Sequence, residues 1–236
     1  MTRIISGKEP SDSLRLIIVG DTGGIPFYPY YSHTQKNVAR IMEILAEQRN
    51  LQYVINVGDN IYFTGTSFED VYNGRGLNVP WFMIAGNHDH FGNVFAQVAY
   101  TKYSRKWIFP KLYYKLSFSL NDISVDILMI DTIVLCGNTA DIQNGAAFDV
   151  LLTRSHVPQG PKEPEKAEMQ WRWINENLSA SKADYLFVVG HYPIYSTSSH
   201  GSTPCLINRL DPMLKAYGVS AYIAGHDHNL QVNQYL

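Results

Sequence analysis

The chain has 236 residues, a length that fits one domain with a core of its own. Its formal net charge is −2 and its pI about 6.4, so it lacks the basic excess that is typical of a nucleic-acid-binding protein. Its apolar runs are all shorter than the roughly 18 residues that a membrane-spanning helix needs.

The first strand is predicted at residues 14–19, and it ends in Gly20-Asp21. A helix is predicted next, because Ser32-His33-Thr34-Gln35 has the form of a capping box. Apolar residues after this box are expected on one buried helical face: Val38, Ile41, Met42, Leu45 and Ala46.

Four further short apolar runs have the β-branched and aromatic content of buried strands, at residues 53–57, 81–85, 185–189 and 220–224. They end in Gly58-Asp59-Asn60-Ile61-Tyr62, Gly86-Asn87-His88-Asp89-His90, Gly190-His191 and Gly225-His226-Asp227-His228. A glycine at the end of a strand lets the backbone come close to a ligand. The side chains that follow are therefore expected to gather at the carboxyl ends of the strands, where open α/β folds bind ligands.

The middle of the chain follows a different pattern. Two alternating runs around Asn121-Asp122 predict a β-hairpin. Residues 137–163 contain glycine and proline without a regular period, so they predict a long surface loop. Pro164 suits a first helical turn, and the helix has an apolar stripe of Ala167, Trp171, Ile174 and Leu178. The alternation of strands and helices indicates an α/β fold with parallel strands.

Seven of the side chains at the strand ends can bind a metal: Asp21, Asp59, Tyr62, Asn87, His191, His226 and His228. This mixture of carboxylate, phenolate, amide and imidazole suits iron, manganese or zinc. Seven ligands are too many for one ion and suit two. Two ions roughly 3.5–4 Å apart can stabilise both the attacking and the leaving oxygen of a displacement at phosphorus.

These motifs resemble those of the binuclear metallophosphoesterases, and within them the purple acid phosphatases of the tartrate-resistant type. The match extends from Leu14 to Leu230, and Tyr62, three residues after Asp59, is the distinguishing mark of the purple branch. The resemblance implies a mixed α/β (α+β) fold, a four-layer sandwich of two β-sheets flanked by helices. It implies one domain over residues 1–236, truncated at the C-terminus, because the family continues beyond the position of Leu236.

The resemblance also implies a role for each candidate ligand. It puts Asp21, Tyr62 and His228 on a ferric ion, Fe(3+), with Asp59 as a bridge. A second, divalent ion, Fe(2+), Zn(2+) or Mn(2+), would have the ligands Asn87, His191 and His226. This division agrees with charge, since anionic oxygens suit the trivalent ion and neutral ligands the divalent one.

Four further residues have expected roles. His88 and His200 resemble the family's outer histidines, which contact the phosphoryl oxygens and help the leaving group, so they are the catalytic candidates. His90 and Asp227 are expected to orient metal ligands, because a metal-bound histidine usually donates its other N–H to an acceptor.

The function implied is an acid phosphatase that hydrolyses phosphate monoesters, small or on a phosphoprotein, by attack of a metal-bound hydroxide at an Fe(III)–M(II) centre. It would act as a monomer, with no nucleic-acid or membrane partner. The alternatives are a manganese or zinc phosphodiesterase or phosphoprotein phosphatase, and a non-catalytic iron-binding or redox-active relative. Tyr62 disfavours the manganese and zinc enzymes, which usually have no phenolate ligand.

From the residues alone, Cys136 and Cys205 are either a disulfide or two buried thiols. The resemblance places them at the family's disulfide, and so implies a secreted or lysosomal glycoprotein whose leader is not in this chain. A glycosylation sequon stands at Asn177-Leu178-Ser179, and Thr22 replaces a tryptophan of the family. In the family, a loop at the place of residues 137–163 covers the site, and cleavage within it raises activity.

Overall fold

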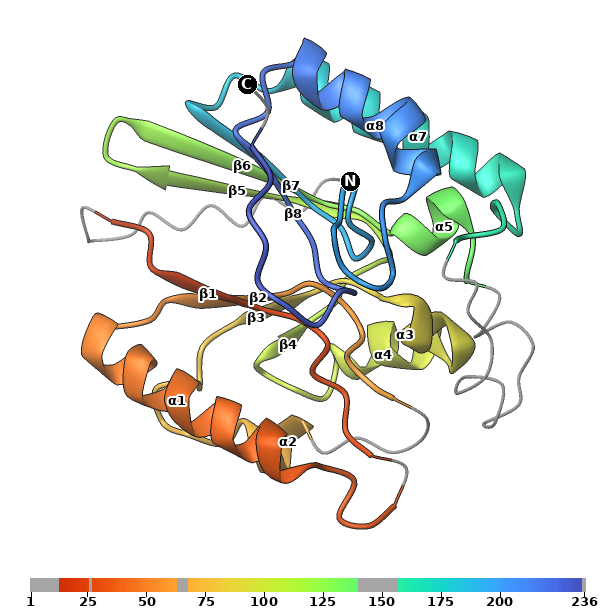
Figure 1. Ribbon diagram of the computed structural model, residues 1–236. Coiled ribbons are helices and arrows are strands. Elements are labelled where there is room, and N and C mark those ends of the chain that lie inside the picture. Colours follow the sequence, from red (N-terminus) through yellow and green to blue (C-terminus); the bar gives the residue numbers. More distant parts are fainter. Residues whose placement is uncertain (1–12, 26, 63–67, 140–156, 235–236) are drawn as a thin grey trace.

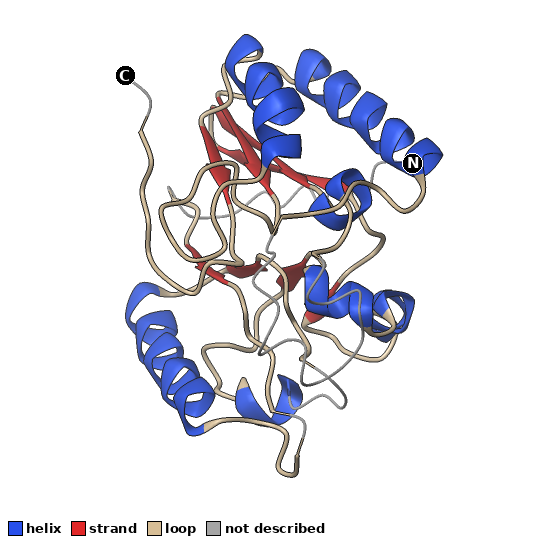
Figure 2. Cartoon of the chain, turned by 45° about the vertical axis from the view of Figure 1, so that its right-hand side comes forward, coloured by secondary structure: helices blue, strands red, loops and turns tan. Residues whose placement is uncertain are grey.

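The computed structural model describes residues 13–25, 27–62, 68–139 and 157–234. Two four-stranded sheets face one another, and helices cover the outer face of each sheet (Figures 1 and 2). The expected sandwich of two sheets flanked by helices is therefore confirmed. In the described part of the chain, no helix combines the length and apolarity needed to cross a bilayer.

The first sheet is entirely parallel, in the order β1-β2-β3-β4. Its strands are β1 (Leu16–Val19), β2 (Tyr53–Asn56), β3 (Trp81–Met83) and β4 (Trp107–Ile108). Its helices are α1 (His33–Arg49), α2 (Phe68–Val71), α3 (Asn87–Phe91) and α4 (Val94–Tyr100). Every residue of β2 and β3 is buried, as expected for parallel strands covered on both faces.

The second sheet has the order β5-β6-β7-β8, and only its first pair is antiparallel. Its strands are β5 (Tyr114–Leu120), β6 (Ile123–Met129), β7 (Tyr185–Val189) and β8 (Ala221–Ile223). Its helices are α5 (Thr132–Cys136), α7 (Pro164–Ala180) and α8 (Pro204–Ala216). The predicted hairpin is confirmed as β5 and β6, with Asn121 in the turn at a φ of 50°.

Two apolar cores hold the layers together. The larger core includes the space between the sheets, where Tyr53 of the first sheet packs on Phe118 of the second with ring centroids 5.1 Å apart. The smaller core lies on the other face of the second sheet, where Trp171 and Ile174 of α7 and Leu206 of α8 are buried. Burial of each such side chain contributes about 1.5–3 kcal/mol to the stability of the fold, so the two cores hold the sheets and helices together.

Helix α1 begins at the predicted capping box. The backbone N–H of Gln35 donates to Ser32 Oγ at 3.0 Å, and the N–H of Ser32 donates to Gln35 Oε1 at 3.2 Å. The expected buried face is correct only in part. Met42 and Ala46 are buried, together with Gln35 and Ala39, but three residues of the predicted face are exposed: Val38, Ile41 and Leu45. The apolar arc of the helix is wider than the surface that the sheet offers it.

Helix α7 is as predicted, with Pro164 in its first turn and its whole apolar stripe buried. The side chain of Asn177, in the sequon, donates to the carbonyl of Trp173 one turn earlier. A disulfide between Cys136 and Cys205 joins α5 to the start of α8, so the alternative of two free thiols is wrong.

Candidate metal centre

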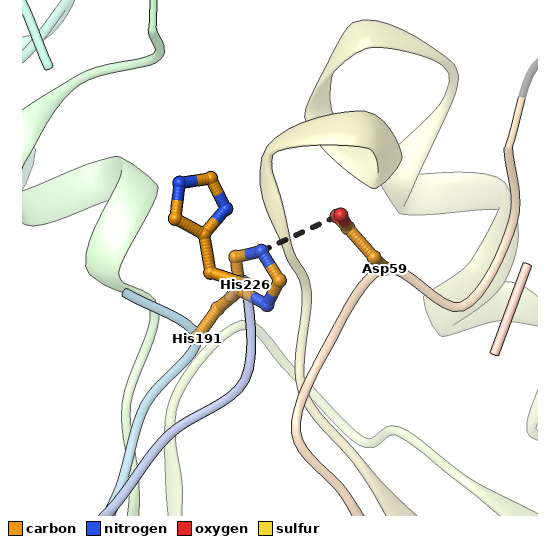
Figure 3. A group of neighbouring side chains, drawn as sticks. All are labelled: Asp59, His191 and His226. Atoms are coloured by element: carbon orange, nitrogen blue, oxygen red, sulfur yellow. Dashed lines mark ion pairs between the residues drawn. The ribbon is translucent and has the colours of Figure 1, made fainter. Parts of the chain in front are cut away.

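Buried side chains from both sheets converge at the carboxyl ends of the strands. Asp59 follows β2, His191 follows β7 and His226 follows β8, and one ligand atom of each lies within 4.8 Å of the others. In Figure 3, Asp59 lies across from the chain segments that carry His191 and His226. Its Oδ1 is 3.5 Å from His191 Nε2. Asn87, the first residue of α3, places its Oδ1 2.9 Å from the same His191 nitrogen.

The other three predicted ligands form a second group beside this one. His228 Nε2 lies 3.2 Å from the hydroxyl of Tyr62 and 3.3 Å from Asp21 Oδ1. Asp59 lies between the groups, because it faces the buried histidines and also pairs with the Tyr62 hydroxyl. All seven predicted ligands thus lie in two adjoining groups that share one carboxylate.

Three of these residues have an unusual backbone. Asp21, Asp59 and His226 have φ values of 53°, 52° and 72°, in the left-handed region that non-glycine residues rarely adopt. Each such residue costs roughly 1–3 kcal/mol, and strain of this kind is concentrated at functional sites. Each follows a strand and a glycine, so the same local backbone turn presents three candidate ligands at the carboxyl ends of the strands.

The contacts of His191 test whether a cation fits here. Its Nδ1 lies 2.9 Å from the carbonyl oxygen of Val57, which can only accept, so Nδ1 carries the proton and Nε2 faces Asn87 Oδ1. Burial lowers the pKa of His191, but Asp59, together with Asp21 and the hydrogen bond to Val57, outweighs burial and raises it to about 9. Without a metal, a proton on Nε2 therefore supplies the positive charge between His191 and Asn87 Oδ1, and a bound cation would take the place of that proton. The donor set therefore fits a metal ion.

The charge balance of the second group also calls for a cation. Burial, and then the carboxylates of Asp59 and Asp21, raise the pKa of Tyr62 above its ordinary value. A phenolate at this position therefore needs a strong positive charge beside it. His226 differs, because burial, followed by repulsion from His191, lowers its pKa and leaves it neutral with a lone pair for a metal.

The two catalytic candidates lie beside different candidate ligands. The ring of His88 meets the Tyr62 ring edge-on at 4.4 Å, and its Nε2 is 4.0 Å from Asp59 Oδ2. The ring of His200 lies 4.3 Å from that of His226. Both histidines are therefore close enough to the candidate ligands to contact a group bound among them.

Asp89 is a functional residue that the sequence argument did not single out. It is buried in α3 and accepts hydrogen bonds from the backbone N–H groups of Asn60, Ile61 and Gly86 and from the side chain of Gln97. It thereby fixes the segment between two proposed ligands, Asp59 and Tyr62. Ile61 and Asn60 lie 28 and 29 positions away from Asp89 along the chain, so only its place three residues after Gly86, typical of a capping carboxylate, gave a signal.

His90 and Asp227 were expected to orient metal ligands, but their hydrogen bonds go to other groups. His90 Nε2 lies 2.7 Å from Asp131 Oδ2 at the end of β6, and Asp227 Oδ1 accepts the backbone N–H of His200. These contacts position α3 and the segment around His200. Both residues therefore act on the elements that present the catalytic candidates.

The predicted loop at residues 137–163 starts and ends beside the site. Thr139 pairs with Pro158, and the side chain of Asn138 donates to the carbonyl oxygen of Asn87 at 3.1 Å. Residues 140–156 lie outside the described part of the chain. The expectation that this loop covers the site therefore stays a prediction.

Comparison with known proteins agrees with this architecture. The family model of the calcineurin-like phosphoesterases matches residues 14–230, so the chain belongs to this family. It is 43% identical to tartrate-resistant acid phosphatase type 5 of Mus musculus, over 97% of this chain and 70% of the relative. It is 29% identical to purple acid phosphatase 7 of Arabidopsis thaliana, over 95% of this chain and 67% of the relative.

A similar solved structure is described as GAP50, the anchor in the inner membrane complex of Plasmodium. It superposes with a TM-score of 0.72 and 25% sequence identity, and covers 92% of this chain and 66% of the other. The chain therefore spans about two thirds of that structure and about 70% of its mouse relative.

Proposed function

We propose that this protein is an acid phosphatase that hydrolyses phosphate monoesters at a binuclear Fe(III)–M(II) centre. The observation that carries the proposal is the convergence of Asp59, His191 and His226, buried between the sheets with their ligand atoms within 4.8 Å. The relatives named acid phosphatase support the reaction class.

The two groups of side chains differ in charge, which supports unlike ions. Asp21, Tyr62 and His228 would hold the ferric ion, because a carboxylate and a phenolate suit a trivalent charge. One amide and two imidazoles, all neutral, would hold the divalent ion: Asn87, His191 and His226. Asp59 would bridge the ions. Once bound, the ions would supply a hydroxide nucleophile at acidic pH and positive charge for the phosphate oxygens.

The chain's own residues would orient the ester and handle the proton. His88 lies beside Tyr62 and His200 beside His226, and both can donate N–H groups to phosphoryl oxygens. A protonated histidine can also give its proton to the departing alkoxide, and an unperturbed pKa near 6.5 keeps that proton available below neutral pH.

The disulfide supports a secreted or lysosomal location, since such bonds persist in oxidising compartments. The protein would act there on phosphate esters as a monomer. Expression for testing should therefore use an oxidising host.

The experiment combines metal analysis, a visible spectrum and hydrolysis by aerobically purified protein. We expect one iron and one further transition metal per chain, a broad visible band that Tyr62→Phe removes, and faster turnover of p-nitrophenyl phosphate than of its diester, at acidic pH. A colourless protein with two zinc ions would refute the iron assignment. A preference for the diester would refute the monoesterase.

A further inference from the structure

The segment between β1 and α1 displays aromatic side chains on the surface. Phe27 is 73% exposed and Tyr28 is 87% exposed, and Ile25 and Tyr30 are exposed as well. Residues 22–32 contain no Asp, Glu, Lys or Arg. Several large exposed side chains in one uncharged segment are unusual on a protein surface and are typical of a binding surface. We call these four residues the aromatic rim.

The aromatic rim is connected to the candidate metal centre. Gly23 lies against the ring of Tyr62 so closely that a Cβ at this position would clash with it, and its N–H donates to the carbonyl of Asp59 at 3.0 Å. Gly24 packs in the same way on the backbone of Tyr30. The ring of Tyr30 in turn meets that of Tyr28 edge-on at 6.3 Å. The backbone thus runs directly from its contact with a proposed metal ligand, Tyr62, into the rim.

The rim is held at both ends. On the β1 side, Thr22 Oγ1 accepts the amide of Asn56 at 2.8 Å, and the Thr22 carbonyl accepts the amide of Gln35 at 2.7 Å. On the α1 side, Lys36 Nζ lies 4.5 Å above the ring of Tyr31. A segment fixed at its ends loses little conformational entropy when it binds, and Tyr and Phe side chains have few torsions to freeze.

We propose that the aromatic rim binds apolar or aromatic residues that flank the phosphorylated side chain of a peptide substrate. The proposal rests on the proposed phosphatase function. Gly23 packs on Tyr62, and Phe27 follows it by four residues, at most about 14 Å along the chain. The residues that flank a phosphorylated side chain at the metal centre can therefore extend onto the rim. An uncharged surface selects apolar flanks over basic or acidic ones, because a charge placed there would lose water and gain no partner.

A membrane surface fits the rim less well. Binding to anionic lipids needs several lysines or arginines near the inserted side chains, whereas residues 22–32 contain none, Lys36 beside Tyr31 is a single cation, and the chain carries a net charge of −2. If the rim bound uncharged lipid in place of a peptide, the proposal would be overturned.

The test measures kcat and KM with three substrates: p-nitrophenyl phosphate, a phosphoserine peptide with Phe and Leu next to the phosphoserine, and the same peptide with Ser and Gly there. Phe27→Ser and Tyr28→Ser remove the rim. Tyr103→Ser is the matched control, because Tyr103 is 82% exposed and lies between α4 and β4, outside the segment of the rim.

We expect the wild type to have a KM about tenfold lower for the apolar peptide than for the polar one, the ratio that about 1.4 kcal/mol of aromatic contact gives. The double variant Phe27→Ser, Tyr28→Ser should lose this preference with kcat unchanged, and Tyr103→Ser should keep it. With p-nitrophenyl phosphate, all variants should match the wild type within about twofold, since that ester has no flanking residues for the rim to bind.

Equal KM values of the wild type for both peptides would overturn the proposal. So would a preference that survives in the double variant, or rim-dependent sedimentation with phosphatidylcholine vesicles in place of a peptide effect. Failure of the proposed function is a separate result, because the wild type would then not hydrolyse p-nitrophenyl phosphate at all.

Discussion

A buried ion pair connects the two halves of the candidate site, and its removal should destabilise the protein in a pH-dependent way. Asp131 is fully buried at the end of β6. Its Oδ2 lies 2.7 Å from His90 Nε2 in α3, and its Oδ1 accepts the N–H groups of Ile133 and Val134 at the start of α5. One carboxylate therefore joins the second sheet to the helix that carries Asn87 and His88.

Two substitutions of Asp131 should lower the free energy of unfolding by different amounts. Asp131→Ala removes the pair with His90 and the cap of α5 together, and loss of one partner of a buried pair costs about 3–5 kcal/mol. Asp131→Asn keeps a capping oxygen, since Asn caps helices as well as Asp does, and loses only the charge. Its cost should be about 1.5–3 kcal/mol, the value of a hydrogen bond to a charged group.

The sign of the pH dependence follows from His90. Burial lowers the pKa of His90, but Asp131, together with the charge of Asp89, outweighs burial and raises it above its ordinary value. Because the folded pKa exceeds the unfolded one of about 6.5, the stabilisation is complete below pH 6.5 and fades as the pH rises through the folded pKa. The deficit of Asp131→Asn should therefore be larger at about pH 5.5 than at about pH 9.

Urea unfolding at these two pH values measures the effect, with His90→Gln completing a double-mutant cycle. The reasoning is refuted by a deficit of Asp131→Asn that is the same at both pH values. It is equally refuted if Asp131→Ala and His90→Gln add without any coupling energy.

Two predictions concern the roles of the site residues in turnover. Asn87→Ala should remove the divalent ion and nearly abolish activity, which metal counting and a p-nitrophenyl phosphate assay would detect together; an active variant with both metals would contradict this role. His88→Ala and His200→Ala should retain both metals and slow the reaction by roughly 10²-fold. The loss should be smaller for leaving groups of low pKa, which need no proton, so equal losses across a series of aryl and alkyl phosphates would count against acid catalysis.

Local patterns in the sequence were enough to predict most of the fold. The hairpin of β5 and β6 and the start of α1 at Ser32 depend on residues a few positions apart, and both are confirmed. The buried face of α1 could not be predicted as well. Apolar residues cover a wide arc of this helix, and which part is buried depends on the sheet beneath it, so Ile41 and Leu45 are exposed.

Most of the candidate site could be predicted for a similar reason. Two residues that support the site could not be predicted, for a different reason. Each ligand follows a strand, so a strand pattern with a polar residue at its end was a sufficient signal for residues such as Asp59 and His191. Asp89 and Asp131 act on backbone groups and side chains that are distant in sequence. The role of Asp89 depends on how the segments after β2 and β3 pack together, and that of Asp131 on how the two sheets face one another, which no local pattern encodes.

The glycines of the strand-end motifs also leave space for neighbouring ligand side chains, and one substitution can test this role by itself. Gly86 has a φ of −106°, which any residue adopts, so its lack of a side chain matters for space alone. A Cβ at Gly86 would overlap Asp59 Oδ1 and lie 2.5 Å from the backbone nitrogen of Asp59. Gly86→Ala must therefore displace the proposed bridging ligand, while the strands and the helix around it can persist.

Gly92→Ala is the matched control at the other end of α3, because its nearest neighbour would be the carbonyl oxygen of Asp89 at an ordinary contact distance of 3.7 Å. We expect Gly86→Ala to retain the far-ultraviolet circular dichroism of the wild type and to lose bound metal and activity. Gly92→Ala should keep both. If Gly86→Ala binds metal as the wild type does, then Asp59 is not held in the position that a bridging ligand needs, and the division of the site into two groups around it would be wrong.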